Sequence, residues 1–320
     1  MKGRHRKRAK AFVDRSNWMG DLCIEIRDEI PLSNLSIPGT HNSFTYSLDK
    51  KSPIGPDSSE WLVELGKYLP LIRPYIYRWS KCQDFNVQTQ LSAGARYFDI
   101  RLAVKSVTEL RVIHALYGAE IGPILKQIRD FLQFHSEEVV ILDFQHLYDF
   151  SADHYTSLEA LIDGIFGKWI CSPSEPKDKL TLSYLKSKDI RVVVIYPLNK
   201  GRYWTRGDCL NPWANTTSAT KLVKFLSDNL PHRDPNRLYV SQGILTADAA
   251  FIVQNLLSSI RKSLAPKAAS AIIHEWLPSV SNSNIVILDF AGDYPGFIDA
   301  IMSKNHFQCR NFRSRTSHFV

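Results

Sequence analysis

The feature that most constrains this fold is the alternation of short apolar runs with longer amphipathic stretches. The runs at 192–195 and 285–288 contain only Val, Ile and Leu. Strands that are apolar at every position are typical of a parallel sheet covered on both faces. Between such runs, apolar residues recur with the spacing of a helix that buries one face. The sequence therefore predicts an α/β fold in which parallel strands alternate with helices.

Seven strands can be read from this alternation. We expect them at residues 32–37, 96–102, 111–114, 139–144, 191–196, 238–245 and 285–290. We expect helices at residues 18–30, 87–93, 121–135, 155–166, 182–185, 217–229, 247–264, 268–276 and 297–304, and a helix broken by prolines at 61–79. The segment at 49–57 is rich in Pro, Gly, Ser and Lys, which predicts a surface loop.

Ionisable residues stand where several expected strands end. His41 follows the first apolar run, Asp99 and Arg101 close the second, and His114 closes the third. In a (β/α)8 barrel the active site lies at the C-terminal ends of the strands. We therefore expect a single-domain TIM-type (β/α)8 barrel, irregular or incompletely closed. An open doubly wound sheet would gather the same residues, but the sequence has no glycine-rich dinucleotide loop to support it.

These four residues indicate a reaction class. Two histidines and an arginine are the minimum set for moving a proton, stabilising a phosphate and protonating a leaving group. We interpret the chain as an enzyme that acts on a phosphodiester.

The positive charge of the chain is concentrated at its two ends. The chain carries 40 Lys and Arg against 32 Asp and Glu, and nine of the basic residues lie in the first ten and last eleven positions. We expect a basic disordered tail at 1–16, a catalytic barrel at 17–306 and a basic C-terminal tail at 307–320. Because the body is nearly neutral, we expect no nucleic-acid partner. Basic tails fit an anionic membrane surface, or a nuclear-import signal.

Cysteine usage and hydropathy bear on the compartment. Five cysteines are scattered without C-x-x-C spacing, so we expect reduced thiols. No apolar run approaches the ~20 residues of a membrane span, and no signal-peptide core follows the basic N-terminus. We expect a cytoplasmic protein, peripherally attached to a membrane or partly nuclear, and the sequence makes no prediction of oligomeric state.

Several motifs together resemble one family. They are Pro-Gly-Thr-His-Asn-Ser at 38–43, Gly-Ala-Arg-Tyr-Phe-Asp-Ile-Arg at 94–101 and the run that ends in His114, with further matches at 137–144 and 212–217. This set resembles the catalytic X-domain of phosphatidylinositol-specific phospholipases C, and more narrowly the small eukaryotic proteins that consist of little more than that domain. The resemblance extends from about residue 18 to residue 305.

The resemblance implies a reaction and roles for residues. The inositol 2-hydroxyl attacks the phosphorus of a phosphatidylinositol-type lipid, diacylglycerol leaves, and an inositol cyclic phosphate forms before it is hydrolysed. His41 matches the general base and His114 matches the general acid. Asp289 matches the carboxylate that holds His41 in its productive tautomer.

Arg101 bears on the cofactor. In the metal-dependent branch of the family, carboxylates near this position hold calcium, whereas an arginine takes the place of the metal in the bacterial branch. The resemblance to the bacterial branch implies no metal and no other cofactor, with Asp99 orienting Arg101 or His114. A guanidinium supplies a fixed charge and bidentate donors to a phosphate without an ion.

Some positions depart from the bacterial pattern. Asn42 stands where bacterial members have an aspartate, and Ala115 stands where the family usually has glycine. Gln145 and Tyr196 occupy positions where charged contacts to the headgroup are expected. We take Asn42, Gln145, Tyr196 and Gln242 as candidate substrate-binding residues. The aromatic loop that contains Tyr203, Trp204 and Trp213 is either a segment that dips into a bilayer or a packed lid.

Two other functions remain as alternatives at this stage. The departures at Asn42, Ala115, Gln145 and Tyr196 fit a catalytically impaired phosphoinositide-binding or scaffold protein on the same barrel. A metal-dependent glycerophosphodiester phosphodiesterase is the second, because barrels host many phosphodiesterases and a fold does not determine a function.

Overall fold

The computed structural model describes residues 13–60, 62–63, 70–106, 108–198 and 200–316, with side chains up to residue 306 apart from Pro70. Its strands are β1 (Ile37–Thr40), β2 (Tyr97–Ser106), β3 (Glu109–His114), β4 (Leu116–Glu120), β5 (Val140–Tyr148), β6 (Val192–Ile195), β7 (Cys209–Leu210), β8 (Leu238–Gln242) and β9 (Ile285–Leu288). Its helices are α1 (Ile24–Glu29), α3 (Arg73–Ser80), α4 (Val87–Ala93), α5 (Ile121–Phe134), α6 (Ala152–Phe166), α7 (Leu182–Ser187), α8 (Ala219–Asn229), α9 (Ala249–Gln254), α10 (Ile260–Ser263), α11 (Ala265–Ala271), α12 (Leu277–Ser279) and α13 (Pro295–Thr316).

Seven of the strands run parallel in the order β6-β5-β2-β1-β9-β8-β7. The first strand, β1, pairs with both β2 and the last strand, β9, which is the relation that a barrel requires. In the part of the chain that the structure describes, no ladder joins β6 to β7, although Trp204 forms a parallel bridge to Ile195 at the end of β6. The expected α/β fold with an irregular, incompletely closed parallel barrel is confirmed.

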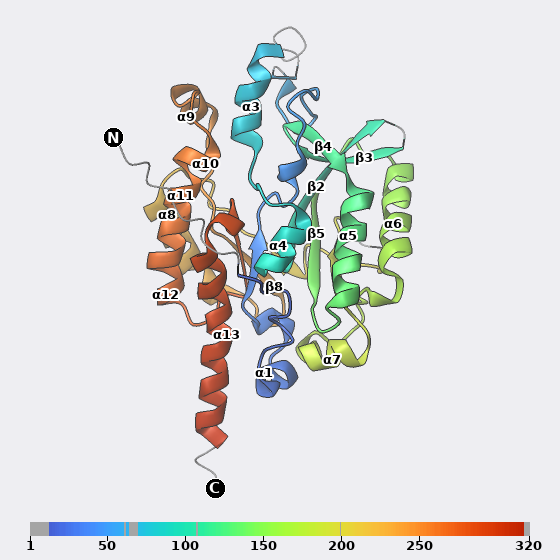
Figure 1. Ribbon diagram of the computed structural model, residues 1–320, viewed down its shortest axis with the longest axis vertical. Coiled ribbons are helices and arrows are strands. Elements are labelled where there is room, and N and C mark those ends of the chain that lie inside the picture. Colours follow the sequence, from blue (N-terminus) through green and yellow to red (C-terminus); the bar gives the residue numbers. More distant parts are fainter. Residues whose placement is uncertain (1–12, 61, 64–69, 107, 199, 317–320) are drawn as a thin grey trace, which may run out of the picture.

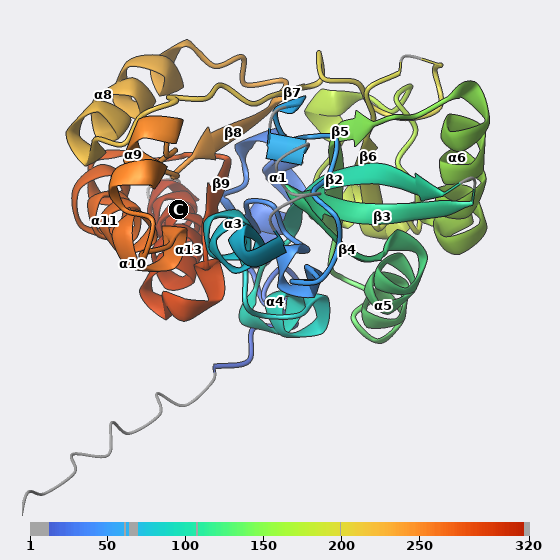
Figure 2. The same cartoon turned by 90° about the horizontal axis from the view of Figure 1, so that it is seen from above.

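Side chains alternate between the inside of this barrel and the helices around it. Ile37, Tyr97, Ile141, Val193 and Ile287 come from five strands yet form one buried cluster, so they face one another in the interior. Their chain neighbours belong to two outer clusters, beneath α4, α5 and α6 on one side and beneath α8, α11 and α13 on the other. Figures 1 and 2 show these helices flanking the sheet. Positions that share the parity of the inner residues therefore point toward the barrel axis.

The strand expected at 111–114 has the opposite direction to that of a barrel strand. β3 pairs antiparallel with β2 and with β4, and the three form a sheet extension that projects from the barrel at the upper right of Figure 1. Only eight residues separate the expected strands at 96–102 and 111–114. A parallel connection needs a crossover of a dozen or more residues, so this spacing permits only a reversal.

Several element boundaries differ from expectation. The first strand begins at Ile37 because residues 32–34 form a 3-10 turn instead, and only residues 24–29 of the expected helix at 18–30 are helical. The segment at 247–264 divides into α9 and α10, which are joined by residues 255–259. The short strands β4 and β7 were missed.

The two expected tails are partly structured. Residues 1–12 and 317–320 lie outside the described residues, but Arg15 Nε donates to Asp299 Oδ1 at 2.8 Å, so the folded part begins before residue 17. At the other end α13 continues to Thr316, into the segment expected to be a tail.

The cysteines follow the expectation only in part. Cys82, Cys171 and Cys209 are free and buried, as expected of reduced thiols. Cys23 is disulfide-bonded, so the expectation was wrong for that residue. Cys23 directly precedes α1, and α1 packs against α13. The sequence pattern did not reveal the full length of α13. Within the described ranges, none of the helices combines the length and the hydropathy that a transmembrane segment needs.

Candidate active site

His41 is the first residue beyond β1, on the inner face of the barrel. Its Nδ1 atom lies 2.7 Å from Oδ1 of Asp289, the first residue beyond β9. Gln83 Nε2 donates to the backbone oxygens of both His41 and Leu288, at 2.9 Å each, and so joins the ends of these two strands. With the carboxylate accepting from Nδ1–H, the neutral imidazole directs an unprotonated Nε2 into the site, as a general base requires.

Asp99 and Arg101 lie two residues apart on the inner face of β2. Arg101 Nη2 donates to Asp99 Oδ2 at 3.4 Å and lies 3.3 Å from His41 Nε2. Burial alone would raise the pKa of Asp99, but the charge of Arg101 and the hydrogen bonds from the Asn42 backbone and Arg101 help to hold that pKa below its ordinary value. Burial alone would lower the pKa of Arg101, but the charge of Asp99 raises it, and the pKa of the guanidinium lies above its ordinary value. Arg101 is thus a fixed cation beside the candidate base.

His114 reaches the same place from the end of β3. Its Nδ1 atom lies 2.6 Å from the backbone oxygen of Ser80, which can only accept, so Nδ1 carries the proton and Nε2 of the neutral ring is free to accept one. Burial and then the charge of Arg101 lower the pKa of His114, against the opposing effects of Asp57 and the Ser80 carbonyl. Asp57 is held close because its Oδ2 atom accepts from the Ala115 backbone N–H at 2.6 Å.

Asn42 joins the two histidines. Its Nδ2 atom lies 3.1 Å from His41 Nε2 and 3.3 Å from His114 Nε2, and its backbone N–H donates to Asp99 Oδ2 at 2.9 Å. Its φ is +45°, a left-handed conformation that asparagine tolerates better than most side chains. The two ring nitrogens that would exchange protons therefore lie on either side of one amide group.

A second polar cluster lies on the inner face beside these residues. Tyr97 Oη and Gln145 Nε2 both donate to Asp143 Oδ2, at 2.6 and 2.7 Å. Asn211 Nδ2 donates to Tyr97 Oη at 3.3 Å and Gln242 Nε2 donates to the Asn211 backbone oxygen at 3.2 Å. Burial, followed by the charge of nearby Asp99, raises the pKa of Asp143 to about 7 despite these hydrogen bonds. Apart from Asp143, this cluster offers neutral hydrogen-bonding groups.

The structure brings together all but one of the residues expected in the site. His41, Asn42, Asp99, Arg101, His114 and Asp289 form one hydrogen-bonded group, and Gln145 and Gln242 belong to the second cluster. Tyr196 does not join them. Its ring packs against Phe144, Tyr155 and Tyr203 in the outer core, because position 196 has the parity of the outward-facing residues of β6.

Besides Asp57, Ser80, Gln83 and Tyr97, three more residues near the site were not expected. Cys82 lies in the loop before α4, and its Sγ atom accepts from Asn42 Nδ2 at 3.5 Å. His146 stands opposite Arg101 because a bulge shifts the register of β2 against β5 between Ile100 and Arg101. Asn211 follows the missed strand β7. Only tertiary structure places Cys82 here, and His146 owes its place to the bulge between β2 and β5, which the apolar pattern does not reveal.

The comparison with known proteins identifies the family. The chain is 34% identical to the mouse protein "PI-PLC X domain-containing protein 2" over 306 residues, which are 92% of this chain and 88% of the relative. The chain belongs to the PI-PLC X domain-containing proteins. It is also 33% identical to human "PI-PLC X domain-containing protein 3", over 91% of this chain and 94% of that protein. The family model "Phosphatidylinositol-specific phospholipase C, X domain" matches residues 74–196.

Solved structures support the fold of this PI-PLC X domain-containing protein. The phosphatidylinositol-specific phospholipase C of Listeria monocytogenes superposes with a TM-score of 0.64 over 91% of this chain and 99% of that one, at 19% identity. The corresponding S. aureus enzyme gives a TM-score of 0.64 at 17% identity, over 91% and 98% of the two chains. The residues matched by the X-domain model include Arg101 and His114, whereas His41 and Asp289 lie outside them.

Proposed function

We propose that this chain is a phosphoric diester hydrolase that cleaves phosphatidylinositol-type lipids to diacylglycerol and an inositol cyclic phosphate. One observation carries the proposal: two imidazoles direct Nε2 toward the same amide of Asn42 because each is fixed at Nδ1, by Asp289 and by the Ser80 carbonyl, and the Arg101 guanidinium lies 3.3 Å from Nε2 of His41. With His41 neutral and with His114 having taken up a proton at Nε2, this pair supplies the one base and the one acid that an in-line displacement requires.

In the first step, His41 Nε2 takes the proton of the inositol 2-hydroxyl. The freed oxygen forms a bond to phosphorus, the bond from phosphorus to the diacylglycerol oxygen breaks, and protonated His114 gives its proton to that oxygen. In the second step water enters with the roles of the two histidines reversed, and the ring of the cyclic phosphate opens. Asp289 and Asp99 hold His41 and Arg101 in place and leave the proton balance unchanged.

Arg101 is proposed to bind a non-bridging phosphate oxygen. Its guanidinium lies 3.3 Å from His41 Nε2, so a phosphate bound to it would be next to the base. Its Nε atom is buried without a hydrogen-bond partner, which leaves a donor for such a ligand. A donor fork with a permanent charge can stabilise the charge that develops on phosphorus in the transition state. The reaction as proposed needs no metal.

The second cluster is proposed to receive the headgroup. Gln145 and Gln242 offer amides, and the Oδ1 atom of Asn211 is buried without a partner. Asn42 would contact the reacting groups themselves. Amide and hydroxyl groups suit the hydroxyls of a polyol better than additional phosphates, which favour arginine and lysine.

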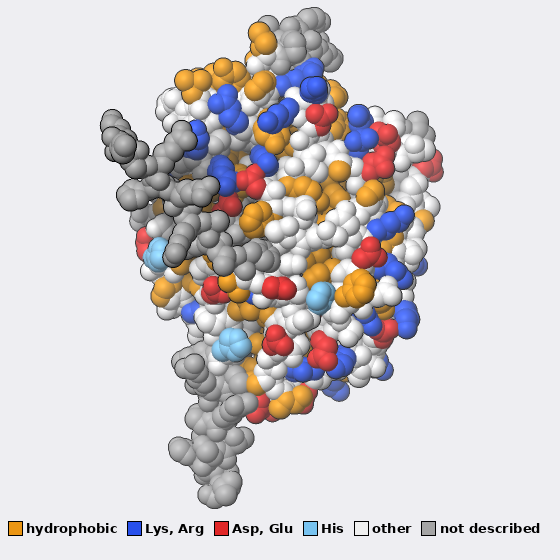
Figure 3. Space-filling view, viewed as in Figure 1, with side chains coloured by type: hydrophobic (Ala, Val, Ile, Leu, Met, Phe, Trp, Pro, Cys, Tyr) orange, Lys and Arg blue, Asp and Glu red, His pale blue; other side chains and the backbone are white. Residues whose placement is uncertain are grey.

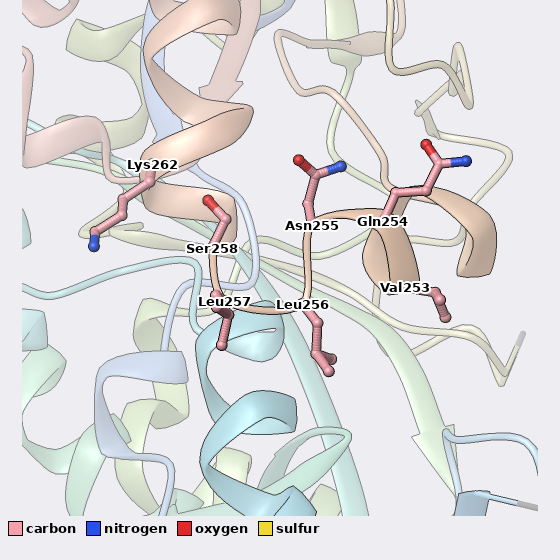
Figure 4. A pocket seen from close by; sticks show the side chains of 7 residues that line it. All are labelled: Val253, Gln254, Asn255, Leu256, Leu257, Ser258 and Lys262. Atoms are coloured by element: carbon pink, nitrogen blue, oxygen red, sulfur yellow. The ribbon is translucent and has the colours of Figure 1, made fainter.

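The loop between α9 and α10 is proposed to face the membrane that holds the substrate. Val253 at the end of α9 and Leu257 in the loop are 73% and 76% exposed, and Figure 4 shows them with Leu256 around a shallow hollow. Arg78 of the adjacent helix α3 donates to the Leu257 backbone oxygen, and Lys262 also borders the hollow. Figure 3 shows apolar and basic side chains together at this end of the molecule. Apolar side chains beside cations suit an anionic lipid interface.

The aromatic loop contributes one residue to an exposed surface. Tyr203 and Trp204 are buried, which fits a packed segment, whereas Trp213 is half-exposed and donates to Thr246 Oγ1 at 2.9 Å. The basic tails are also proposed to bind an anionic membrane surface. Most residues of these tails lie outside the described ones.

Phosphorus NMR of phosphatidylinositol vesicles with the purified chain tests the reaction. We expect the resonance of an inositol 1,2-cyclic phosphate to appear with the wild type and to be lost in His41→Ala and in His114→Ala. Both variants should remain folded, since each removes a side chain at the barrel mouth and leaves the apolar core intact.

One observation favours a second candidate, a phosphoinositide-binding protein with impaired turnover. The Asn42 amide lies within hydrogen-bonding distance of both Nε2 atoms that must exchange protons. Vesicle binding without any cyclic product, in wild type and variants alike, would favour this candidate.

A further inference from the structure

Cys82 brings a thiol to the candidate base. It is fully buried, its backbone N–H donates to Thr45 Oγ1 at 3.0 Å, and its backbone oxygen accepts from the Phe290 N–H at 2.7 Å. These two bonds attach Cys82 to the loops that follow β1 and β9, which also carry His41 and Asp289. The position of Sγ is therefore determined by the same strands as the proposed catalytic pair.

The three side chains form a compact donor set. One ligand atom each from His41, Cys82 and Asp289 lie within 4.8 Å of one another. Two ligands of one tetrahedral zinc ion lie roughly 3 to 4 Å apart, given metal–ligand bonds of about 2.0 to 2.3 Å. Small side-chain rotations would therefore bring all three onto one ion, once the 2.7 Å contact between His41 and Asp289 opens to admit it.

We propose that His41, Cys82 and Asp289 form an inhibitory binding site for a thiophilic divalent metal ion, with Zn²⁺ as its type. Imidazole, thiolate and carboxylate are the three donor classes that zinc uses, whereas calcium and magnesium take oxygen ligands. The fourth position would hold water. This ion would not be a catalytic metal, because it would bind the side chain of His41, the proposed general base.

The local charge balance supports a dication. Asp99 and Asp289 supply two carboxylates, and Arg101, which pairs with Asp99, supplies one cation. The Cys82 thiol donates to the Ser80 backbone oxygen at 3.6 Å, and metal binding would displace this proton. With the thiolate formed, the net charge of these groups is minus two, which the metal ion neutralises.

The same surroundings disfavour redox regulation at this thiol. Burial, and then the charge of Asp289, raise the pKa of Cys82 well above that of an ordinary thiol. Oxidants attack thiolates that are accessible.

Inhibition follows from the identity of the ligands. An ion bound to Nε2 of His41 would occupy the lone pair that accepts the proton. An ion bound to Nδ1 would break the contact with Asp289 that orients the ring. This consequence rests on the proposed function, whereas metal binding itself does not, so the two can fail separately.

Titration of the purified full chain with Co²⁺, a spectroscopic substitute for Zn²⁺, tests the site. We expect one equivalent to produce a thiolate-to-cobalt charge-transfer band that Zn²⁺ abolishes and Ca²⁺ leaves unchanged. Cys82→Ser should lose the band. Cys209→Ser, which changes another buried free thiol in the barrel interior, should keep it. A band that persists in Cys82→Ser, or no thiolate band in the wild type, would overturn the proposal.

His41→Gln provides a second variant that retains the thiol. It should weaken Co²⁺ binding by about tenfold or more, and circular dichroism confirms that each variant is folded. Unchanged affinity in His41→Gln would remove His41 from the site. In turnover assays, Zn²⁺ should inhibit and excess chelator should restore the rate. A thiolate band in a chain without turnover would uphold the metal site and reject the hydrolase, and turnover without a band would do the reverse.

Discussion

The Nδ1 atom of His41 lies 2.7 Å from the Oδ1 atom of Asp289, although 248 positions separate these residues in the chain. The reason is the register of β1 against β9, in which Thr40 pairs with Leu288. His41 and Asp289 are the next residues of the two strands and share the inward parity. The pairing of the first and last strands of the barrel thus creates the orientation of the proposed base.

Arg101→Lys should lower kcat/KM by roughly 100- to 1000-fold, the cost of losing a positioned transition-state donor. Lysine keeps the charge but cannot offer the planar donor fork to a phosphate. Steady-state kinetics on phosphatidylinositol vesicles measures this. Arg111→Lys, on β3 and paired with Glu109, is the matched control and should change the rate little. Equal rates for Arg101→Lys and wild type would remove Arg101 from the site.

His114 should titrate below its ordinary pKa of 6.5 in the free protein, because burial and the charge of Arg101 lower it while Asp57 opposes them. Proton NMR of the imidazole ring measures this, with His114→Gln identifying the resonance. Arg101→Met should shift the titration upward, because it removes a cation that disfavours the protonated ring. A His114 pKa above 6.5 in the wild type would contradict the described environment.

The lowered His114 pKa also has a consequence for stability. Between the folded pKa of His114 and 6.5, the unfolded chain binds more protons than the folded chain. The contribution of His114 to the free energy of unfolding is therefore full above pH 6.5 and is lost as the pH falls through the folded pKa.

Asp143→Asn should become more stable relative to wild type as the pH rises from about 4 to about 8. The folded pKa of Asp143 is raised from 3.8 to about 7. Between these values the carboxyl ionises in the unfolded chain but keeps its proton in the folded chain, so the wild type loses stability as the pH rises. The change is worth up to about 4 kcal/mol at about 1.4 kcal/mol per pKa unit. Urea denaturation at several pH values measures it, with exposed Asp130→Asn as control. A stability difference that stays constant with pH would refute the raised pKa.

The double variant Val253→Ser, Leu257→Ser should weaken binding to phosphatidylinositol-containing vesicles by roughly tenfold or more, because each side chain contributes about 1.5 to 3 kcal/mol when fully buried. Sedimentation with sucrose-loaded vesicles measures this. Phe134→Ser changes an apolar side chain that is 84% exposed at the end of α5 and serves as control. Equal losses in control and double variant would mean that the α9–α10 loop is not the membrane-facing surface.

The sequence predicted the fold where strand patterns and motifs coincide. The runs before His41, Arg101 and Asp289 are apolar strands of the barrel. Because alternate residues of a strand face the same side, the pattern also predicts that these three side chains point into the barrel. The same period would have excluded Tyr196, which has the parity of the outward-facing Val192 and Val194. The β2–β3 reversal could also have been derived from its short connection.

Other features depend on tertiary structure alone. Cys82 belongs to a loop without a motif, and only the hydrogen bonds to Thr45 and Phe290 bring it to the base. The contact of Asn42 with both histidines requires the β3 strand to return from outside the barrel. The apolar periodicity of the sequence predicts neither the position of Cys82 nor the contacts of Asn42.

Product formation in excess chelator tests the central claim most directly. Purified chain is incubated with phosphatidylinositol vesicles and a strong divalent chelator, and inositol 1,2-cyclic phosphate is followed by phosphorus NMR alongside His41→Ala. Histidine acid–base catalysis with Arg101 in place of a metal predicts cyclic product at an undiminished rate in the chelator and none in the variant. Product that forms only after calcium is added back, or product formation that persists in His41→Ala, would contradict it.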